Sequence, residues 1–544
     1  MTVSTDPLNS FVYLFKNTSM KNFLLSILLL SCNLGSAQTF EWVAQKQVKF
    51  SFNPSMPHSI LRAAGNGQCW SVSTDSGSTI YGSELYGIVS LDLIDAGGNL
   101  VTTHRLGPEV SIYDIAADQN GKLYVAGSFM GTNHIDQQDS LLNTGIGLNT
   151  DPFLICFNAN GTIKWKRNLG GGLGSATLHT LAVAPSGEAY FSLYNFTDAS
   201  INHLDSAGNS IGQIVIDGVR GIGDFCFDPW GNLYVTGPTQ AGTFSIGNYS
   251  ATINEPYAIY ITRLNASGQV SWAHFGHDVT FQMPSVVADG AGNAYIAGDL
   301  MDSLTWGNHH LSGPDWVYDF WLTKVDSLGN FLWAKEGPNP VGSITGDFQR
   351  GTGRSVACDL NGNVMLAGNL RGSIDWGNGV TVTNPVIQYS NLHVVLFDAA
   401  GNAQWAKNVT DSSYANMNGI IEMDGDLYFS ASHNGPGNLL FDTINVNFNY
   451  PQNTLVAKID APAVTGIDQI SETTNANIVF PNPAHTMTMI PSDWLNNSPI
   501  ALFSIDGKLL KSYVPVDAGL DVSGFPAGLY LLKNQRSVIK LILY

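Results

Sequence analysis

Two short patterns of apolar and polar residues alternate along most of the chain. The first is an Asp-rich turn with a glycine, followed by a strand-forming run, as in Asp359–Gly368 (DLNGNVMLAG). The second places a similar turn before a strand that contains tryptophan, as in Val325–Lys335 (VDSLGNFLWAK). Asp side chains accept hydrogen bonds from their own turn, and glycine tolerates the positive φ that such turns need. Both patterns predict short antiparallel strands joined by tight turns.

The first pattern recurs with a spacing of about 60 residues, in the range of four-stranded blades with long loops, whereas tandem β-sandwiches need units nearer 100 residues. Each period predicts an apolar strand, the turn, a second strand, a variable loop and two further strands. The turn glycines are Gly67, Gly121, Gly187, Gly231, Gly292, Gly362 and Gly425. Seven such turns predict an all-β, seven-bladed β-propeller over residues 38–460.

The tryptophans of the second pattern are expected to pack between neighbouring blades, because they hold a fixed place in the repeat; sugar stacking is the alternative. A second group falls in or near loops, where stacking on glycans is again an alternative to packing. The repeat tryptophans are Trp165, Trp272, Trp333 and Trp405, and the loop tryptophans are Trp230, Trp306, Trp316 and Trp376.

The two ends of the repeat region predict how the ring closes. The last period stops at Leu455–Asp460 (LVAKID) without its tryptophan strand, whereas Phe40–Ala44 (FEWVA) has that pattern near the N-terminus. Trp42 there matches Trp333. We therefore expect the N-terminal segment to supply the outer strand of the last blade, because main-chain pairing removes an open seam.

Residues 20–37 have the features of a secretory signal peptide. An apolar run, Phe23–Leu30, follows Lys21, and small residues lead to a cleavage site after Ala37. Residues 1–19 are interpreted as an extension from a mis-assigned start. A lipoprotein site at Cys32 is the alternative, disfavoured because Leu30 is bulky for that motif. The run is too short to span a bilayer, and no later segment approaches the roughly 20 apolar residues needed.

Composition narrows the function classes. The chain carries 43 acidic and 24 basic residues, a formal net charge of -19, so nucleic acid and anionic membrane surfaces are not expected partners. The five cysteines show neither a close pair nor metal-like spacing. We expect buried free thiols at Cys69, Cys156, Cys226 and Cys358, with disulfides as the alternative.

No catalytic motif or cofactor constellation is present, and we expect no metal, cofactor or catalytic residue. Turn chemistry explains Asp–Gly turns such as Asp359–Gly362 without calcium, because they lack the closing Glu of an EF-hand loop. His309 and His310 have no further ligand at motif spacing. Acidic residues could converge in a central funnel for glycoside hydrolysis, but the sequence cannot place Asp302, Asp315 or Asp319 there.

The D-x-x-G-N-x-Y-V-A-G and V-D-x-x-G-N-x-x-W-A-K strands over residues 40–460 resemble the SBBP-type seven-bladed propeller repeats of secreted bacterial proteins. The resemblance implies a fold and no activity. Its expected structural positions are Trp42, Trp165, Trp272, Trp333, Trp405, Gly121, Gly231, Gly292 and Gly362.

The C-terminal part divides into a linker-like segment, residues 461–476, and a compact segment, residues 477–544. Alternating short strands in the compact segment predict a small β-sandwich. This segment resembles the type A sorting domain of the type IX secretion system of Bacteroidetes, which implies that machinery as a partner and a domain removed after export. The matching residues are Pro481, Asn482, Pro483, Gly507, Lys508, Gly528, Leu529, Tyr530 and Lys540.

Together these patterns predict a secreted or surface-displayed propeller that acts as a binding or adhesion module for an extracellular glycan or protein. A propeller hydrolase or lyase acting on extracellular polysaccharide is the main alternative. A structural surface protein without a ligand is the third. The fold itself cannot choose among them.

Overall fold

The computed structural model is built from strands, and among the residues that it describes no helix is long and apolar enough to cross a membrane. The predicted signal peptide (residues 20–37), the predicted linker (residues 461–476) and residues 1–19 lie outside the described part. The described residues are 38–50, 59–65, 67–81, 84–118, 120–135, 139–144, 150–170, 178–194, 199–277, 283–300, 303–312, 319–337, 347–351, 353–383, 390–411, 414–449, 452–460, 484–490, 494, 500–504, 508–513, 519–534 and 538–543.

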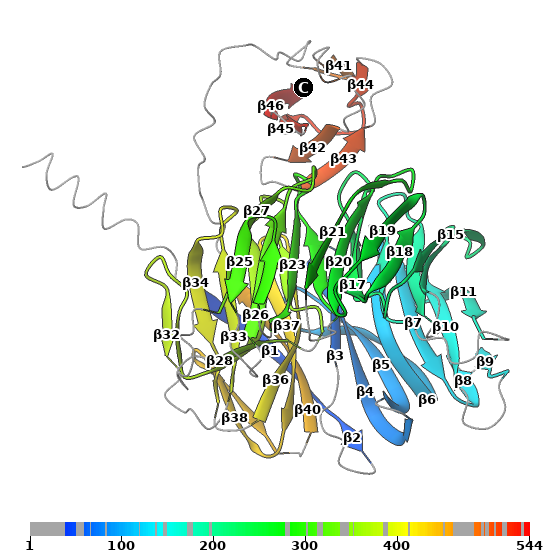
Figure 1. Cartoon of the computed structure of the whole chain (residues 1–544). Helices are drawn as coiled ribbons and strands as arrows, with labels where there is room; N and C mark the ends of the chain where they lie inside the picture. The colour runs from blue at the N-terminus through cyan, green and yellow to red at the C-terminus, as the bar shows by residue number, and fades with distance from the viewer. Residues whose placement is uncertain are drawn as a thin grey trace, which may run out of the picture.

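Antiparallel sheets are arranged around a central axis in residues 38–460, so the chain forms a β-propeller (Figure 1). One sheet has the strand order β22-β23-β26-β27. Its second strand, β23 (Ala294–Leu300), is buried on both faces, because each sheet packs between two neighbours. Consequently this strand is a nearly continuous apolar run. The other strands of the sheet are β22 (Ser285–Ala288), β26 (Asp319–Val325) and β27 (Phe331–Glu336).

The other sheets of the ring have the same four-strand plan, with local additions. The sheet β12-β13-β14-β15 comprises Leu181–Val183, Ala189–Tyr194, Ala199–Leu204 and Ser210–Asp217. The sheet β16-β17-β20-β21 comprises Asp224–Phe227, Leu233–Thr239, Ala258–Leu264 and Val270–His277. The next sheet comprises β28 (Asp347–Arg350), β29 (Val356–Cys358), β30 (Val364–Arg371), β33 (Asn391–Phe397) and β34 (Ala403–Asn408).

A long strand, β6 (Leu100–Ala117), joins two four-stranded sets into one larger sheet. Its first part pairs with β5 and its second part with β7. One set comprises β3 (Ser59–Gly65), β4 (Gln68–Tyr81), β5 (Glu84–Ile94) and the start of β6, with β2 (Lys49–Phe50) beside β4. The other comprises the end of β6, β7 (Leu123–Phe129), β10 (Asp151–Phe157) and β11 (Ile163–Asn168).

The predicted closure of the ring is confirmed. Strand β1 (Thr39–Gln47) pairs antiparallel with β40 (Gln452–Asp460), and Thr39 lies opposite Asp460. Trp42 lies opposite Lys458, in the sheet completed by β37 (Asp426–Asn434) and β36 (Tyr414–Met423). The N-terminal segment therefore provides the outer strand of the last sheet.

The innermost strands contact one another in a closed circle around the axis. In order these strands are β3, β6, β12, β16, β22, β29 and β36, and β36 returns to β3. Figure 1 shows the sheets following one another around this axis. The starts of the innermost strands are therefore brought together from positions far apart in the sequence.

The prediction of a variable loop after the second strand of each repeat is wrong for several repeats, in which the chain forms a β-hairpin there instead. In β24 (Ser303–Trp306) and β25 (His309–Ser312), buried Leu304 lies opposite buried Leu311. Burial of that face and a two-residue turn that begins at Gly307, with φ of 58°, explain the hairpin. Similar hairpins are β8 (Thr132–His134) with β9 (Ser140–Leu142), β18 (Gly242–Ile246) with β19 (Tyr249–Ile253), β31 (Ser373–Asp375) with β32 (Thr381–Thr383), and β38 (Gly437–Phe441) with β39 (Ile444–Phe448). Strand β38 also pairs with β35 (Thr410–Asp411).

The C-terminal part contains two sheets that share a small apolar core, which includes Trp494, Leu502 and Leu532. One sheet has the order β43-β42-β45-β46 and the other pairs β41 with β44. The strands are β41 (Met487–Met489), β42 (Ile500–Ser504), β43 (Leu509–Tyr513), β44 (Gly519–Asp521), β45 (Gly528–Lys533) and β46 (Val538–Leu543).

Candidate functional site: an axial pocket lined by arginines

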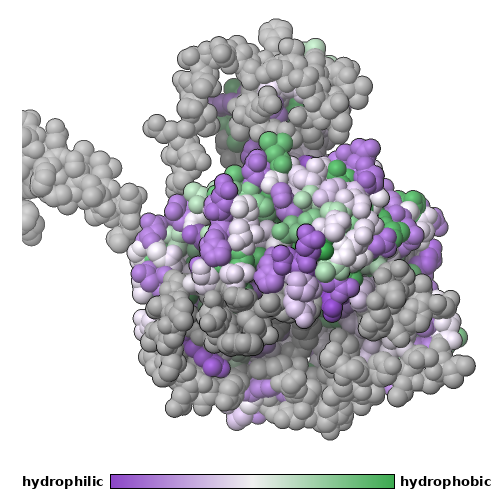
Figure 2. Space-filling view, viewed as in Figure 1, coloured by the Kyte–Doolittle hydropathy of each residue, from purple (hydrophilic) through white to green (hydrophobic). Residues whose placement is uncertain are grey.

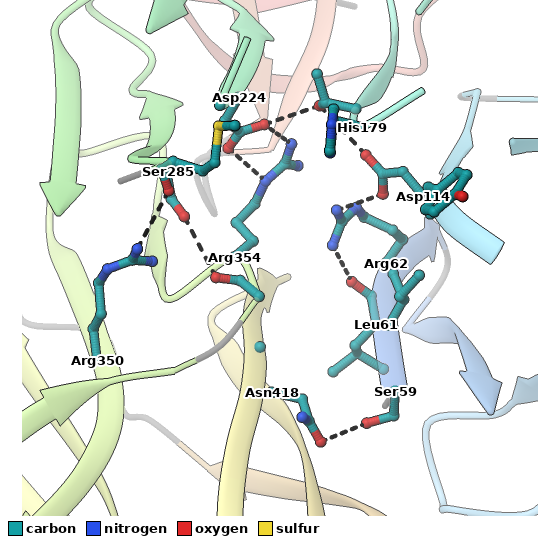
Figure 3. A pocket seen from close by; sticks show the side chains of 17 residues that line it. Ser59, Leu61, Arg62, Asp114, His179, Asp224, Ser285, Arg350, Arg354 and Asn418 are labelled. Atoms are coloured by element: carbon teal, nitrogen blue, oxygen red, sulfur yellow. Dashed lines mark hydrogen bonds and ion pairs between the residues drawn. The ribbon is translucent and has the colours of Figure 1, made fainter. Parts of the chain in front are cut away.

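A cavity of about 220 Å³ lies where the innermost strands begin. Its lining includes residues from β3, β6, β16, β22 and β36, together with residues that precede β12 and β29 (Figure 3). The charged residues of its lining are Arg62, Asp114, Asp224, Arg350 and Arg354, and the exposed residue His179 also lines it. Because these residues come from so many sheets, the pocket exists only in the closed ring.

One repeat position supplies much of the polar lining. It lies seven residues before the turn glycine of each repeat, at or next to the start of the innermost strand in most repeats and within the longer strands β6 and β36. Most copies there are polar although the strand around them is apolar. In order the residues are Ile60, Asp114, Thr180, Asp224, Ser285, Ser355 and Asn418. All of them except Ser355 line the pocket.

The Asp114 carboxylate accepts hydrogen bonds from the backbone of two neighbouring sheets and from one arginine. Its Oδ1 accepts the backbone N–H of Ile115 at 2.8 Å, and its Oδ2 accepts that of Leu181 at 2.9 Å. Arg62 donates Nη2–H to Oδ1 at 2.5 Å. The side chain of Asp114 is only 3% exposed, so the ion pair is largely shielded from water.

The Asp224 carboxylate likewise bonds to two neighbouring sheets and one arginine. It lies on the other side of Thr180, whose hydroxyl is 3.2 Å from Asp224 Oδ1. The Asp224 carboxylate accepts the backbone N–H of Phe225 at 2.9 Å and that of Val286 at 3.0 Å. Arg354 approaches it with two donors, Nε at 3.0 Å and Nη2 at 2.5 Å. This is the bidentate geometry that suits a guanidinium and a carboxylate.

These contacts determine what the pocket can do chemically. The carboxylate oxygens of Asp114 and Asp224 already accept several hydrogen bonds each, so neither is free to transfer a proton to a substrate. Instead, they fix the two guanidinium groups in place. The charge of Asp224 raises the pKa of Arg354 despite its burial, whereas burial and the charge of Arg354 lower the pKa of Arg62. The pocket thus presents the N–H groups of two fixed guanidinium groups as hydrogen-bond donors for a ligand.

The repeat tryptophans lie between sheets and are absent from the pocket lining. Trp165, Trp272 and Trp333 each donate their indole N–H to a carbonyl of the next sheet, those of Ser206, Ser327 and Ala399, at 3.3, 3.2 and 3.2 Å. Trp42 does the same with Ala96 at 2.8 Å. Trp405 is buried, and the turn expected to face it lies beyond Asp460, outside the described residues.

The turn glycines explain how closely these rings approach. A Cβ on Gly208 would lie 2.6 Å from the Trp165 ring, and one on Gly98 would lie 2.7 Å from Trp42. Gly121, Gly231, Gly292 and Gly362 have positive φ, between 74 and 86°. In the same turns, Asp228 accepts the backbone N–H groups of Trp230 and Asn232. Hydrogen bonds within the turn therefore account for the Asp residues, as turn chemistry predicts.

Within the described part of the chain, the loop tryptophans and histidines do not gather in one site. Trp306 and Trp376 are buried, and Trp376 stacks on His393. His309 contacts the Phe331 carbonyl, and His310 contacts the Thr305 hydroxyl. Trp316, Asp302 and Asp315 lie outside the described residues, and Asp319 is described only in its backbone. No metal-binding group of three His, Cys, Asp or Glu side chains occurs among the residues that the structure describes.

Four cysteines are free thiols: Cys69, Cys156, Cys226 and Cys358. Cys69 and Cys156 are completely buried. Burial raises the pKa of Cys69 to about 12 and that of Cys156 to about 11. Since the thiolate is the reactive form, neither has the character of a nucleophile.

A second cavity, also of about 220 Å³, lies at the closure of the ring. There Lys46 on β1 forms ion pairs with Asp75 and Asp92, both at 2.7 Å. Arg105 contacts Asp75 at 3.1 Å. These charges join the N-terminal strand to the neighbouring sheet.

Within the C-terminal part, Gly528, Leu529 and Tyr530 begin β45, and the Tyr530 hydroxyl donates to the Pro526 carbonyl at 2.7 Å. Lys540 lies on β46 and is exposed, and Lys508 immediately precedes β43. Pro481, Asn482, Pro483 and Gly507 lie outside the described residues. On the face of the propeller seen in Figure 2, the coloured residues are polar and apolar side chains interspersed, without one dominant patch.

Comparison with known proteins gives different results for the propeller and for the C-terminal part of the chain. No curated protein matches it. Its fold is similar to that of a virginiamycin B lyase from Staphylococcus aureus, at 9% identity and a TM-score of 0.38, over 76% of this chain and 99% of that one. It is also similar to PorZ, a surface component of the type IX secretion system of Porphyromonas gingivalis, at 10% identity and a TM-score of 0.29, over 89% and 70% of the two chains.

A protein of unknown function from Bacteroides caccae is similar at 13% identity and a TM-score of 0.31, over 65% of this chain and 94% of that one.

The C-terminal part of the chain matches a known protein family. Residues 478–542 match the model of the secretion system C-terminal sorting domain. The chain is therefore a β-propeller that carries the C-terminal sorting domain of the type IX secretion system and is exported to the cell surface or secreted.

Proposed function

We propose that this exported protein is a binding module and that the axial pocket is its ligand site. The observation that carries the proposal is the pair of arginines, Arg62 and Arg354, fixed in one cavity by carboxylates from other sheets. Preorganised polar donors in a concave site are typical of ligand recognition, because little entropy is lost when the ligand binds. An extracellular glycan or protein with a protruding polar group is the expected ligand, and adhesion is the expected role.

The architecture that supports this proposal is a ring of seven blades. The circle of innermost strands and the closing strand β1 support that number. We also infer that residues 20–37 are removed as a signal peptide, that residues 461–476 are a linker, and that residues 477–544 form a small β-sandwich removed after export. The repeat tryptophans are then structural, because their indole groups connect neighbouring sheets.

A polysaccharide hydrolase or lyase is the less favoured function. Glycoside hydrolysis needs one carboxylic acid that can give up a proton and one carboxylate that can attack or activate water. Asp114 and Asp224, the acidic residues of the described pocket lining, are engaged by arginine and backbone donors instead. That arrangement favours binding over turnover.

The test is an array of extracellular polysaccharides and matrix proteins probed with the mature chain, with hydrolysis and lyase assays on the same panel. We expect saturable binding without turnover. The variant His179→Trp should abolish binding, because it fills the pocket from an exposed side chain. An unchanged melting temperature would show that this variant folds. Turnover of any polysaccharide, or binding that His179→Trp leaves unchanged, would overturn the proposal.

A further inference from the structure

Three arginines line the cavity, and two of them, from non-adjacent sheets, are held by carboxylates of the pocket lining. Arg62 lies on β3, and Arg354 lies between β28 and β29. Their side chains are 15% and 16% exposed. Figure 3 shows both side chains directed into the space between the strands. Burying two like charges together is costly unless each is compensated, and here Asp114 and Asp224 provide that compensation.

Each arginine retains donors that the protein does not use. Arg62 gives Nη1–H to the Leu61 carbonyl at 2.8 Å and Nη2–H to Asp114, but its buried Nε has no partner among the described residues. Arg354 uses Nε and Nη2 for Asp224, and no described residue accepts from its Nη1. The Arg62 Nε is a buried donor without an acceptor, which is unfavourable, and an acceptor supplied by a ligand would remove that cost. The Arg354 Nη1 is not buried in this way, so it is accessible to a ligand.

The charge balance of the pocket limits what that acceptor can be. Arg62 and Arg354 are neutralised by Asp114 and Asp224, and Arg350 by Asp299 at 2.8 Å. A dianion would bring two uncompensated charges into this neutral site, whereas a monoanion brings one. Charge-assisted hydrogen bonds to a carboxylate are also stronger than those to a neutral oxygen.

The size of the cavity limits the ligand further. At about 220 Å³, the cavity is smaller than the sites that hold drug-sized ligands, which are roughly 300–1,000 Å³. The site therefore suits a small molecule or the end group of a longer one. A polymer chain could enter it with its terminal unit only.

From these observations we infer that the axial pocket selects ligands with a single carboxylate, which Arg62 and Arg354 bind together from two sheets that are separated by the sheet of β36. The inference rests on the proposed binding function and names its ligand class. The carboxylate belongs either to a small free acid or to the terminal sugar of an acidic glycan. Both present the same planar group to the guanidinium donors.

The test measures calorimetric binding of paired probes to the mature chain. The pairs are acetate with acetamide, lactate with lactamide, glucuronate with its methyl ester, and methyl glucuronide with its methyl ester; inorganic phosphate tests the dianion. At least one acid should bind about tenfold or more tightly than its neutral partner, and more tightly than phosphate. Preference for the methyl glucuronide over free glucuronate would identify a glycan end, and the opposite preference a free acid.

Arg62→Lys and Arg354→Lys should each reduce the acid preference about tenfold or more, because lysine lacks the planar fork. Arg105→Lys is the matched control, since the Arg105 side chain is 67% exposed and lies outside the pocket. If a pocket variant fails to fold, the comparison of acid with neutral probe on the unaltered chain still decides. Equal binding of acids and neutral partners would overturn the inference and leave the binding function intact. Absence of ligands from both this panel and the array would overturn both.

Discussion

The indole N–H of Trp42 donates a 2.8 Å hydrogen bond to the carbonyl of Ala96, which ties the N-terminal strand to the sheet on its other side. The Trp42 ring also packs at an angle against Tyr428, with centroids 5.8 Å apart. Trp42 thus contacts both sides of the point at which the ring closes. The stability of the whole propeller should therefore depend on this residue near its N-terminus.

Replacing this tryptophan should weaken the closure. We expect Trp42→Ala to lower the free energy of unfolding by about 2 kcal/mol, from the lost ring burial and the lost hydrogen bond. Urea denaturation of the mature chain, followed by tryptophan fluorescence and circular dichroism, measures this change. Leu328→Ala is the control, because Leu328 is 78% exposed and its loss should leave the midpoint unchanged. Equal midpoints for the two variants would contradict the role of Trp42.

Glycines in equivalent turns should differ in what they tolerate. Gly208 and Gly268 have φ of 82° and 76°, so alanine is strained at both by about 1–2 kcal/mol. A Cβ on Gly208 would also collide with the Trp165 ring, whereas one on Gly268 meets nothing within 4 Å. Gly208→Ala should therefore destabilise the protein clearly more than Gly268→Ala in the same urea experiment. Equal losses would mean that backbone strain alone explains these glycines.

Much of the fold was predictable because its signals are local. The Asp–Gly turns, the tryptophan strands and FEWVA at Phe40–Ala44 each carry their structure in a few residues. The β24–β25 hairpin was also visible in Trp306–His309 (WGNH), a short turn between alternating residues, and was missed. The pocket could not be predicted in this way. Arg354 meets Asp224 across 130 positions, and only the closed ring brings them together.

The acid–base behaviour of Glu422 gives a prediction about pH. Burial, together with the charges of Asp359 and Asp424, raises the pKa of Glu422 to about 7. The folded state therefore holds a proton that the unfolded state has lost above about pH 4.5, so this residue makes stability fall as pH rises from about 4.5 to 7.

The variant Glu422→Gln should remove this loss. We expect it to stabilise the protein by about 1–2 kcal/mol at pH 8 and to have little effect near pH 4, allowing for partial screening by solvent. Urea midpoints at the two pH values measure the difference. Glu255→Gln serves as the control, because the Glu255 side chain is 57% exposed. A stabilisation independent of pH would exclude titration of Glu422 as the cause.

The sorting domain should act independently of the ring. A chain that ends at Asp460 keeps β40 and its pairing with β1, so we expect it to fold and bind as the mature protein does. It should remain inside the cell envelope, whereas the full chain reaches the surface or the medium. Fractionation and immunodetection measure this. A reporter with a signal peptide and residues 461–544 should be exported, and its retention would contradict the assignment.

The pairing of β40 on both edges also has a mechanical consequence. If the protein holds a ligand on the ring axis while its C-terminal side is attached to a cell, tension enters the ring through the end of β40. That strand is bonded to β37 on one side and to β1 on the other. Pulling it out would require shearing two ladders of hydrogen bonds at once, so the attachment point is a reinforced part of the molecule.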